Sequence, residues 1–323
     1  MLRRRLLATA LAAPLATPLA SPGMAQEAFP NRPIRMLVPY SPGGQSDTVA
    51  RLVAPTMADF LGQSIVIENR TGAGGSIAAG LVAQAPADGY TLLFESFAFV
   101  VVPLIHHGLS FDYETAFAPI GQAVALPYVL AVRKSFPAQD LAGFIQAVKA
   151  RPGATYGTPG IGTPGHLAGV LLEQQAGIRL EHVPYRGGAD AARDCGAGSI
   201  DAVIITANSI KPFIDDSRAT GIALTSAEQR GTLAMLPPMA RTLPGIDLTS
   251  WNGLFAPAAT PAPVRARLEA ALQHATTDAE TVRRLALTGN DAVSAGAEAF
   301  GATIRRDRAV VKRIVRETGM KIE

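Results

Sequence analysis

Residues 34–44 read IRMLVPYSPGG, and this stretch sets the alternation on which the fold depends. The apolar run 34–38 has the length and composition of a buried strand, and a turn rich in Pro and Gly follows it. Residues 47–61 then carry apolar side chains at helical spacing. A strand, a tight loop and a helix in this order form the first part of a βαβ unit.

The same alternation repeats along most of the chain. Strands predicted at 64–68 and 91–94, with a helix at 75–84 between them, complete a βαβαβ unit. A second unit has predicted strands at 128–132, 154–156, 180–183, 201–205 and 221–225 and helices at 141–150, 167–175 and 189–197, and residues 263–316 are mostly helical. We therefore expect an α/β protein whose two lobes are each a mostly parallel sheet flanked by helices.

The first 25 residues have the pattern of a secretory signal peptide. Three arginines, Arg3–Arg5, precede the apolar run 6–20, and small residues lead up to Ala25. The run is too short, and too interrupted by proline, to span a bilayer as a stable helix. We expect cleavage after Ala25 and export to the periplasm, by either the general or the twin-arginine route.

Charge and cysteine content exclude several classes of function. The formal net charge is +3, and Arg3–Arg5 account for all of it, so the chain after Ala25 is neutral overall. A neutral chain without a basic patch does not suit nucleic-acid binding. The single cysteine, Cys195, cannot form an intrachain disulfide and is expected to face the core of a helix.

Three loops share the chemistry of an anion site: residues 41–47, 158–166 and 185–188. Each has glycines that allow close backbone approach, and each opens a helix whose first N–H groups have no intrahelical partner. Each loop alone can also be an ordinary capped turn before a helix. The predicted ligand contacts are Ser41, Gly43, Gly44, Ser46, Asp47, Ser96, Thr158, Gly160, Ile161, Gly162, Thr163, His166, Tyr185, Arg186 and Gly187.

Within this set the expected roles differ. The backbone N–H groups of Gly43, Gly44, Gly162 and Thr163 are predicted to hold a carboxylate. The hydroxyls of Ser41, Ser46, Thr158 and Thr163 are predicted to add hydrogen bonds, whereas Asp47 is expected to support the first loop by accepting from N–H groups at the helix start. His166 is equally well placed to donate to a ligand or to cap its own loop.

Residues 160–165 also match G-x-G-x-x-G, the dinucleotide fingerprint, with Glu181 about 20 residues further on. Glu181 is predicted in the middle of a strand, not at its end where a ribose is read, and Pro164 removes a backbone donor. No hydrolase elbow or zinc motif occurs in the sequence. An exported dinucleotide-binding oxidoreductase stays open as an alternative, but we expect no enzyme activity, no cofactor and no metal.

Several motifs together resemble the Bug family, the periplasmic substrate-binding proteins of tripartite tricarboxylate transporters. The segment 33–44, the ENRTGAGG of 68–75 and the DGYTLL of 88–93 are similar to family motifs in the first half of the chain. The loop 156–168, the HVPYRG of 182–187 and the WNGLFAP of 251–257 are similar to family motifs in the second half. These matches follow in order over nearly the whole chain after the signal peptide.

The resemblance implies a two-lobed Venus flytrap fold of type II that closes on a small organic acid and delivers it to a membrane permease, without catalysis. Lobe 1 is expected at 27–124 plus 247–323 and lobe 2 at 125–246, with hinges near 125 and 247 and the ligand cleft between the lobes. We expect a monomer. A ligand sensor for a two-component system would share the same cleft.

The chain departs from the family pattern at two places that bear on the ligand. Gln45-Ser46 stand where a Gly-Thr pair is common, and Glu95 is unusual after the third strand. If Glu95 faces the cleft, it repels a second carboxylate and favours an amine or hydroxyl on the ligand. The alternative is a glutamate turned to solvent at the end of a strand.

Overall fold

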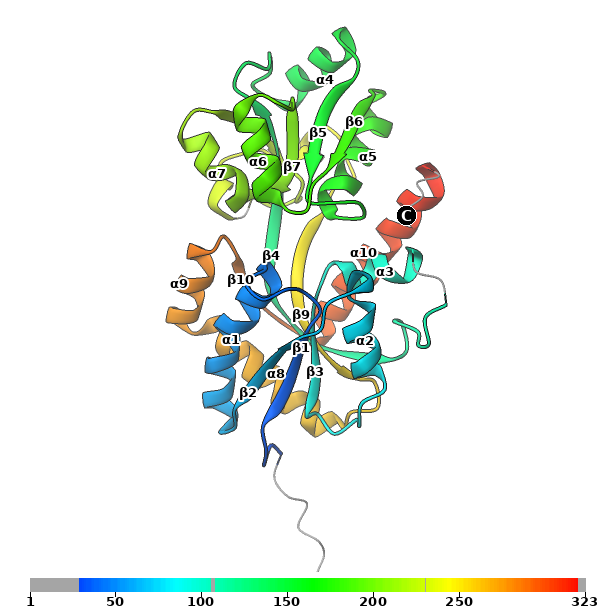
Figure 1. Ribbon diagram of the computed structural model, residues 1–323, viewed down its shortest axis with the longest axis vertical. Helices are drawn as coiled ribbons and strands as arrows, with labels where there is room; N and C mark the ends of the chain where they lie inside the picture. The colour runs from blue at the N-terminus through cyan, green and yellow to red at the C-terminus, as the bar shows by residue number, and fades with distance from the viewer. Residues whose placement is uncertain (1–28, 106–107, 230, 319–323) are drawn as a thin grey trace, which may run out of the picture.

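The computed structural model describes residues 29–105, 108–229 and 231–318. Figure 1 shows two α/β lobes joined by two long strands, β4 (Phe117–Arg133) and β9 (Thr249–Pro257). The signal peptide predicted at 1–25 lies outside the described residues. None of the helices in the described ranges is both long enough and apolar enough to cross a membrane.

The first lobe combines the N-terminal and C-terminal parts of the chain. Its strands β2, β1 and β3 are parallel, and β9 and β10 extend the sheet through antiparallel pairs. Its elements are β1 (Ile34–Val38), α1 (Gln45–Leu61), β2 (Ile65–Asn69), η1 (Ala73–Gly75), α2 (Ser76–Ala83), β3 (Thr91–Ser96), α3 (Ala98–Ile105), α8 (Ala262–Thr277), α9 (Ala279–Leu287), β10 (Asp291–Gly296) and α10 (Ala297–Thr318).

The second lobe is built from the middle of the chain. Its strands β6, β5 and β7 are parallel, and both β7 and β8 pair antiparallel with the second half of β4. Its elements are α4 (Leu141–Ala150), β5 (Ala154–Thr158), α5 (Pro164–Ala176), β6 (Leu180–Pro184), α6 (Gly188–Ala197), β7 (Ala202–Thr206), α7 (Ala207–Asp215), β8 (Ala219–Leu224), η2 (Gly231–Leu233) and η3 (Met239–Arg241).

Most predicted elements are confirmed, and the differences have physical reasons. The predicted strand 128–132 is the second half of β4, because pairing with β9 continues the strand back to Phe117. The helices α3 and α7 and the strand β10 were not predicted. α3 is an almost wholly apolar helix, and a short apolar run of this kind has no helical periodicity to read. Each lobe has the parallel strands that were expected and, in addition, strands that pair antiparallel with β4 or β9.

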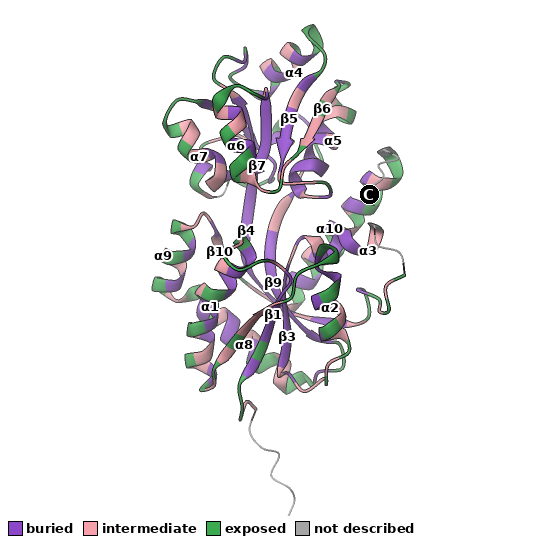
Figure 2. Ribbon diagram, in the orientation of Figure 1, coloured by how far each residue is buried: buried purple, intermediate pink, exposed green. Residues whose placement is uncertain are grey.

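The buried side chains link the two lobes. One cluster joins Phe255 and Phe300 of the first lobe to Tyr156 and Leu171 of the second, and α10 packs on α5. Trp251, 1% exposed, packs in this cluster. Figure 2 shows β4 buried where it passes between the lobes, whereas β9 changes from intermediate to buried along this stretch.

Candidate functional site

Strand directions place the predicted binding loops of the two lobes opposite each other. β1 and β3 are parallel, and three successive antiparallel pairs, β3 with β9, β9 with β4 and β4 with β7, follow across the sheet. Because three antiparallel steps reverse the direction, β7 and its parallel neighbours β5 and β6 run opposite to β1 and β3. The carboxyl ends of both strand sets therefore point toward the junction of the lobes.

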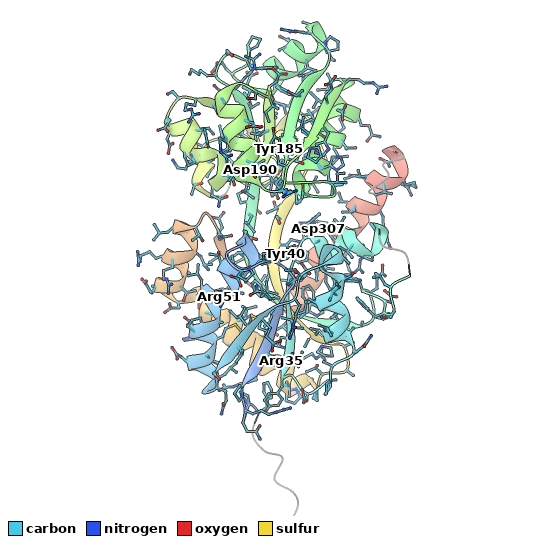
Figure 3. All side chains as sticks on the ribbon, viewed as in Figure 1. Arg35, Tyr40, Arg51, Tyr185, Asp190 and Asp307 are labelled. Atoms are coloured by element: carbon cyan, nitrogen blue, oxygen red, sulfur yellow. The ribbon has the colours of Figure 1, made fainter. Side chains whose placement is uncertain are left out.

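The register on β4 gives the separation of the two sets. Ser96, at the end of β3, lies level with Val124 of β4 through Asn252 of β9. Thr206, at the end of β7, pairs with Tyr128 of β4. Val124 and Tyr128 are four residues apart, or roughly 13 Å along a strand. Figure 3 likewise shows Tyr40 on the first lobe and Tyr185 and Asp190 on the second at the ends that face each other.

Asp47 fixes the first loop. Its carboxylate accepts hydrogen bonds from the Gly43 N–H at 2.8 Å, from Asn69 Nδ2 at 2.8 Å and from Arg51 Nε at 2.9 Å. Burial opposes the charge, but these bonds prevail and lower the pKa of Asp47. Asp47 is buried and supports the loop, as predicted, although the N–H group it binds belongs to the loop and not to the helix.

The backbone N–H groups predicted as ligand donors in the first loop have partners within the protein. The Gly43 N–H binds Asp47, and the Gly44 N–H binds the Ser41 carbonyl at 3.0 Å, so neither is free in this structure. The donors left at this end are the first N–H groups of α1, which begins at Gln45. The N-cap residue of this helix is Gly44, which has no side chain to accept from them. The side chain of Ser41 is exposed beside them.

Gln45 and Ser46 connect α1 to distant segments of the chain. Gln45 Nε2 donates to Asn252 Oδ1 and to Asn290 Oδ1, both at 2.8 Å. Asn252 Nδ2 in turn donates to Ser46 Oγ at 2.7 Å. Ser46 is therefore buried and engaged with protein, so its hydroxyl supports the helix start in this structure. The partners of Gln45 lie more than 200 residues away, and no local sequence pattern signals them.

This network reaches the second lobe through the turn before β10. Asn290 Nδ2 donates to Thr288 Oγ1 at 2.8 Å, and Asn208 Nδ2, at the start of α7, donates to the Thr288 carbonyl at 2.9 Å. Gly289 lies against Asn208 so closely that a Cβ there would come within 2.0 Å of the Asn208 Cβ. The two lobes thus touch at this edge of the molecule.

The second-lobe loop is held by its own side chains. Thr163 Oγ1 donates to the Gly160 carbonyl at 2.8 Å, and the Gly162 N–H donates to His166 Nδ1 at 3.1 Å. Thr158 is fully buried, with its hydroxyl 2.7 Å from His182 Nε2. Thr158 and the Gly162 N–H therefore support the loop in this structure and do not face outward. Ile161 is 46% exposed at its tip.

His166 and His182 stack beneath this loop, with ring centroids 4.2 Å apart. Burial, together with the charge of the neighbouring His182, lowers the pKa of His166 to about 4. A neutral His166 accepts the Gly162 N–H at Nδ1 and carries its own proton at Nε2. Of the two roles open for His166, the structure shows the loop cap.

The third loop follows β6. Tyr185 Oη donates to Asp194 Oδ2 at 2.8 Å, and the Tyr185 N–H binds the Thr158 carbonyl, which ties the second and third loops together. Arg186 is exposed, and Gly187 precedes α6 without a side-chain cap among the described residues. The start of α6 and the Arg186 guanidinium are the positive groups of this loop.

Glu95 adopts neither of its two expected positions. It is 1% exposed, so it faces neither an open cleft nor solvent. Its Oε1 accepts from Tyr40 Oη at 2.5 Å and from the Ser96 N–H at 2.6 Å. Burial raises the pKa of Glu95 to about 7, against the lowering effect of these hydrogen bonds. Tyr40 was not predicted as part of the site.

Cys195 and Glu181, two further candidates for chemistry, lie where the sequence predicts them. Cys195 is buried, as predicted, and burial raises the pKa of its thiol to about 12. Glu181 lies within β6, as predicted. Within the described residues no group of three His, Cys, Asp or Glu side chains is arranged to hold a metal ion.

Comparison with known proteins identifies the family. Residues 49–320 match the model of the tripartite tricarboxylate transporter family receptor, TctC. The chain belongs to this family. Its members are periplasmic solute-binding receptors, so the Bug resemblance of the sequence and the two-lobed binding-protein fold are confirmed.

Three relatives illustrate the match. A UPF0065 protein of the tcbD-tcbE intergenic region of Pseudomonas sp. (strain P51) is 36% identical, over 81% of this chain and 79% of its own. The structure of the periplasmic binding protein BugD is 30% identical and covers 91% of this chain and 99% of its own, with a TM-score of 0.74. A Rhodopseudomonas palustris protein solved with adipate is 29% identical and covers 90% and 98%, with a TM-score of 0.77.

Proposed function

We propose that this protein binds a small carboxylated solute between its two lobes and delivers it to the permease of a tripartite tricarboxylate transporter. One observation carries the proposal: the carboxyl ends of both parallel strand sets point toward the junction from opposite sides. Ligands of open α/β sheets bind at such strand ends. The relative solved with adipate shows that this family accommodates a dicarboxylate.

We place the anion between uncapped helix starts. The first N–H groups of α1 and the start of α6 supply backbone donors, and the helix dipoles favour negative charge there. The side chains of Ser41, Ser96 and Arg186 are accessible or partly accessible at these ends. The buried members of the predicted set, Asp47 among them, hold the loops in shape.

We propose closure about the two connecting strands. The expected boundaries near residues 125 and 247 fall within β4 and just before β9, the strands that pass from one lobe to the other. The lobes are then 27–124 with 247–323, and 125–246. Hinges of this kind are a few positions that absorb the backbone change while each lobe stays rigid.

We further propose that the protein works as an exported monomer without catalysis. Support comes from the side chains a catalyst would need: the Cys195 thiol is buried with a raised pKa, and His166 and His182 are engaged with their own loop. Export rests on the sequence of residues 1–25. A role as a two-component sensor would use the same site with a different membrane partner.

Thermal unfolding in the presence of candidate ligands tests the function. The protein is first unfolded and refolded to remove any bound solute, then mixed with mono-, di- and tricarboxylates, acidic amino acids and NAD. A ligand at about 100 times its Kd stabilises the fold by roughly 2.7 kcal/mol, which gives a clear shift in Tm. We expect a shift with a carboxylate. A shift with NAD alone would contradict the proposal.

A charge introduced at the loop tip locates the site. Ile161→Asp places a carboxylate on the exposed tip of the second-lobe loop and is expected to weaken binding by about tenfold or more through like-charge repulsion. Leu81→Asp, at an apolar residue of similar exposure on α2, is the matched control and should bind as the unmodified protein does. Equal affinity of both variants would place the ligand elsewhere.

A further inference from the structure

Glu95 is a buried carboxyl at the edge of the proposed site. It precedes the last residue of β3, and its neighbour Ser96 is a predicted ligand contact. Tyr40, which binds it, immediately precedes Ser41 of the first loop. Tyr40 and Ser96 are half-buried whereas Glu95 is buried, and Tyr40 lies at the end of the first lobe that faces the second lobe (Figure 3).

The contacts of Glu95 decide where two hydroxyl groups point. Tyr40 Oη lies 2.5 Å from Glu95 Oε1 and 2.5 Å from Ser96 Oγ, and Ser96 Oγ lies 3.2 Å from Glu95 Oε1. An ionised carboxylate only accepts, so it draws these O–H groups inward. A protonated carboxyl donates as well, which leaves a hydroxyl free to donate to a ligand.

Among the described residues, no positively charged side chain is a partner of Glu95. The titratable groups that face it are Tyr40, from the loop after β1, and Tyr113, from the segment before β4. Glu95 Oε2 faces Gly75, where an added Cβ would come within 2.7 Å of it. No lysine or arginine of the described residues forms an ion pair with Glu95.

We propose that Glu95 is a positioning residue that sets the specificity of the first-lobe half of the site, by making capture of an anion there dependent on a proton carried by Glu95. This inference rests on the proposed function. An ionised Glu95 repels the ligand carboxylate and holds the Tyr40 and Ser96 hydroxyls inward. A protonated Glu95 neither repels the ligand carboxylate nor holds these hydroxyls inward. At high pH, binding of one ligand carboxylate is therefore accompanied by uptake of one proton on Glu95.

The coupling operates near neutral pH, since burial raises the pKa of Glu95 to about 7. By linkage, a ligand that raises the proton affinity of Glu95 by some factor is itself bound more tightly, by that same factor, when Glu95 is protonated. A coupling of one pKa unit corresponds to about a tenfold change in Kd across the titration. Ligands with carboxyl groups that ionise well below this range show the effect without titrating themselves.

The test is a pH series of Kd by calorimetry, from about pH 6.5 to pH 8.5, with adipate and benzoate as probes that stay ionised across the range. The unmodified protein is expected to bind about tenfold more weakly at the upper end than at the lower. Glu95→Gln keeps the shape without the ionisable group and is expected to give a flat profile. Tyr40→Phe tests the hydroxyl and should reduce the pH dependence.

Asp307→Asn is the matched control. Asp307 is another buried carboxyl with a raised pKa, but it binds Trp251 Nε1 at 2.9 Å and belongs to α10, outside the loops. The control should keep the pH profile of Kd unchanged. Identical profiles for Glu95→Gln and the unmodified protein would overturn the inference and leave the proposed function intact. Failure of both probes to bind the unmodified protein at every pH would overturn both.

Discussion

At the scale of single residues, the direction of the Glu95 side chain could not be predicted from the sequence. The sequence marks it as unusual and places it at a strand end, but it does not fix the direction of the side chain. That direction depends on Tyr40 and Gly75, which come from other segments and enclose the carboxyl. Asp47 and Cys195 were predictable because their roles follow from local context: a loop before a helix, and an apolar helix face.

Glu95→Gln should change how stability depends on pH. The folded pKa of Glu95, about 7, lies above its ordinary value of 4.5, so Glu95 contributes stability below pH 4.5 that is lost as pH rises through 7. Relative to the variant, the unmodified protein should lose about 3 kcal/mol of unfolding free energy between pH 4 and pH 8. Urea denaturation of both proteins at each pH measures this difference.

Parallel pH profiles for the two proteins would contradict a raised pKa at Glu95. The comparison needs no ligand, so it examines the burial of the carboxyl separately from its proposed effect on binding. His166 acts in the opposite direction: its pKa is lowered to about 4, so its contribution is lost as pH falls, and it is common to both proteins.

At the scale of elements, the helix α1 was predictable from the sequence, but the long-range contacts of its first residue were not. Its apolar spacing and the preceding glycines predict the helix to within two residues of its start. The link from Gln45 to Asn252 and Asn290 spans the whole chain, and neither asparagine carries a local signal. The strand β10 was missed for a similar reason, because pairing with β4 and not its own short sequence defines it.

Gln45→Ala is expected to destabilise the protein by about 1 to 2 kcal/mol, since it leaves the amide oxygens of two buried asparagines, Asn252 and Asn290, without this donor. Chemical denaturation measures the loss. Gln84→Ala, whose side chain makes a long 3.4 Å contact with Ser110, is the control and should be nearly neutral. Equal stability of both variants would show that the α1 network contributes nothing measurable.

At the scale of the whole molecule, the two-lobed arrangement follows from strand direction. The alternation of strands and helices predicts two parallel sheets, and the family resemblance predicts how they are arranged. The antiparallel pairs through β4 and β9 are what turn the loops of one lobe toward those of the other. Those pairs join segments at least 70 residues apart, so sequence periodicity alone does not reveal them.

Hydrogen–deuterium exchange tests the proposal that one carboxylate is bound by both lobes at once. Exchange is followed with and without the carboxylate that gives the largest thermal shift. Slower exchange is expected in two separate segments, 41–49 and 185–192, which include the helix starts of α1 and α6. Protection confined to one lobe, or found only away from both segments, would contradict it.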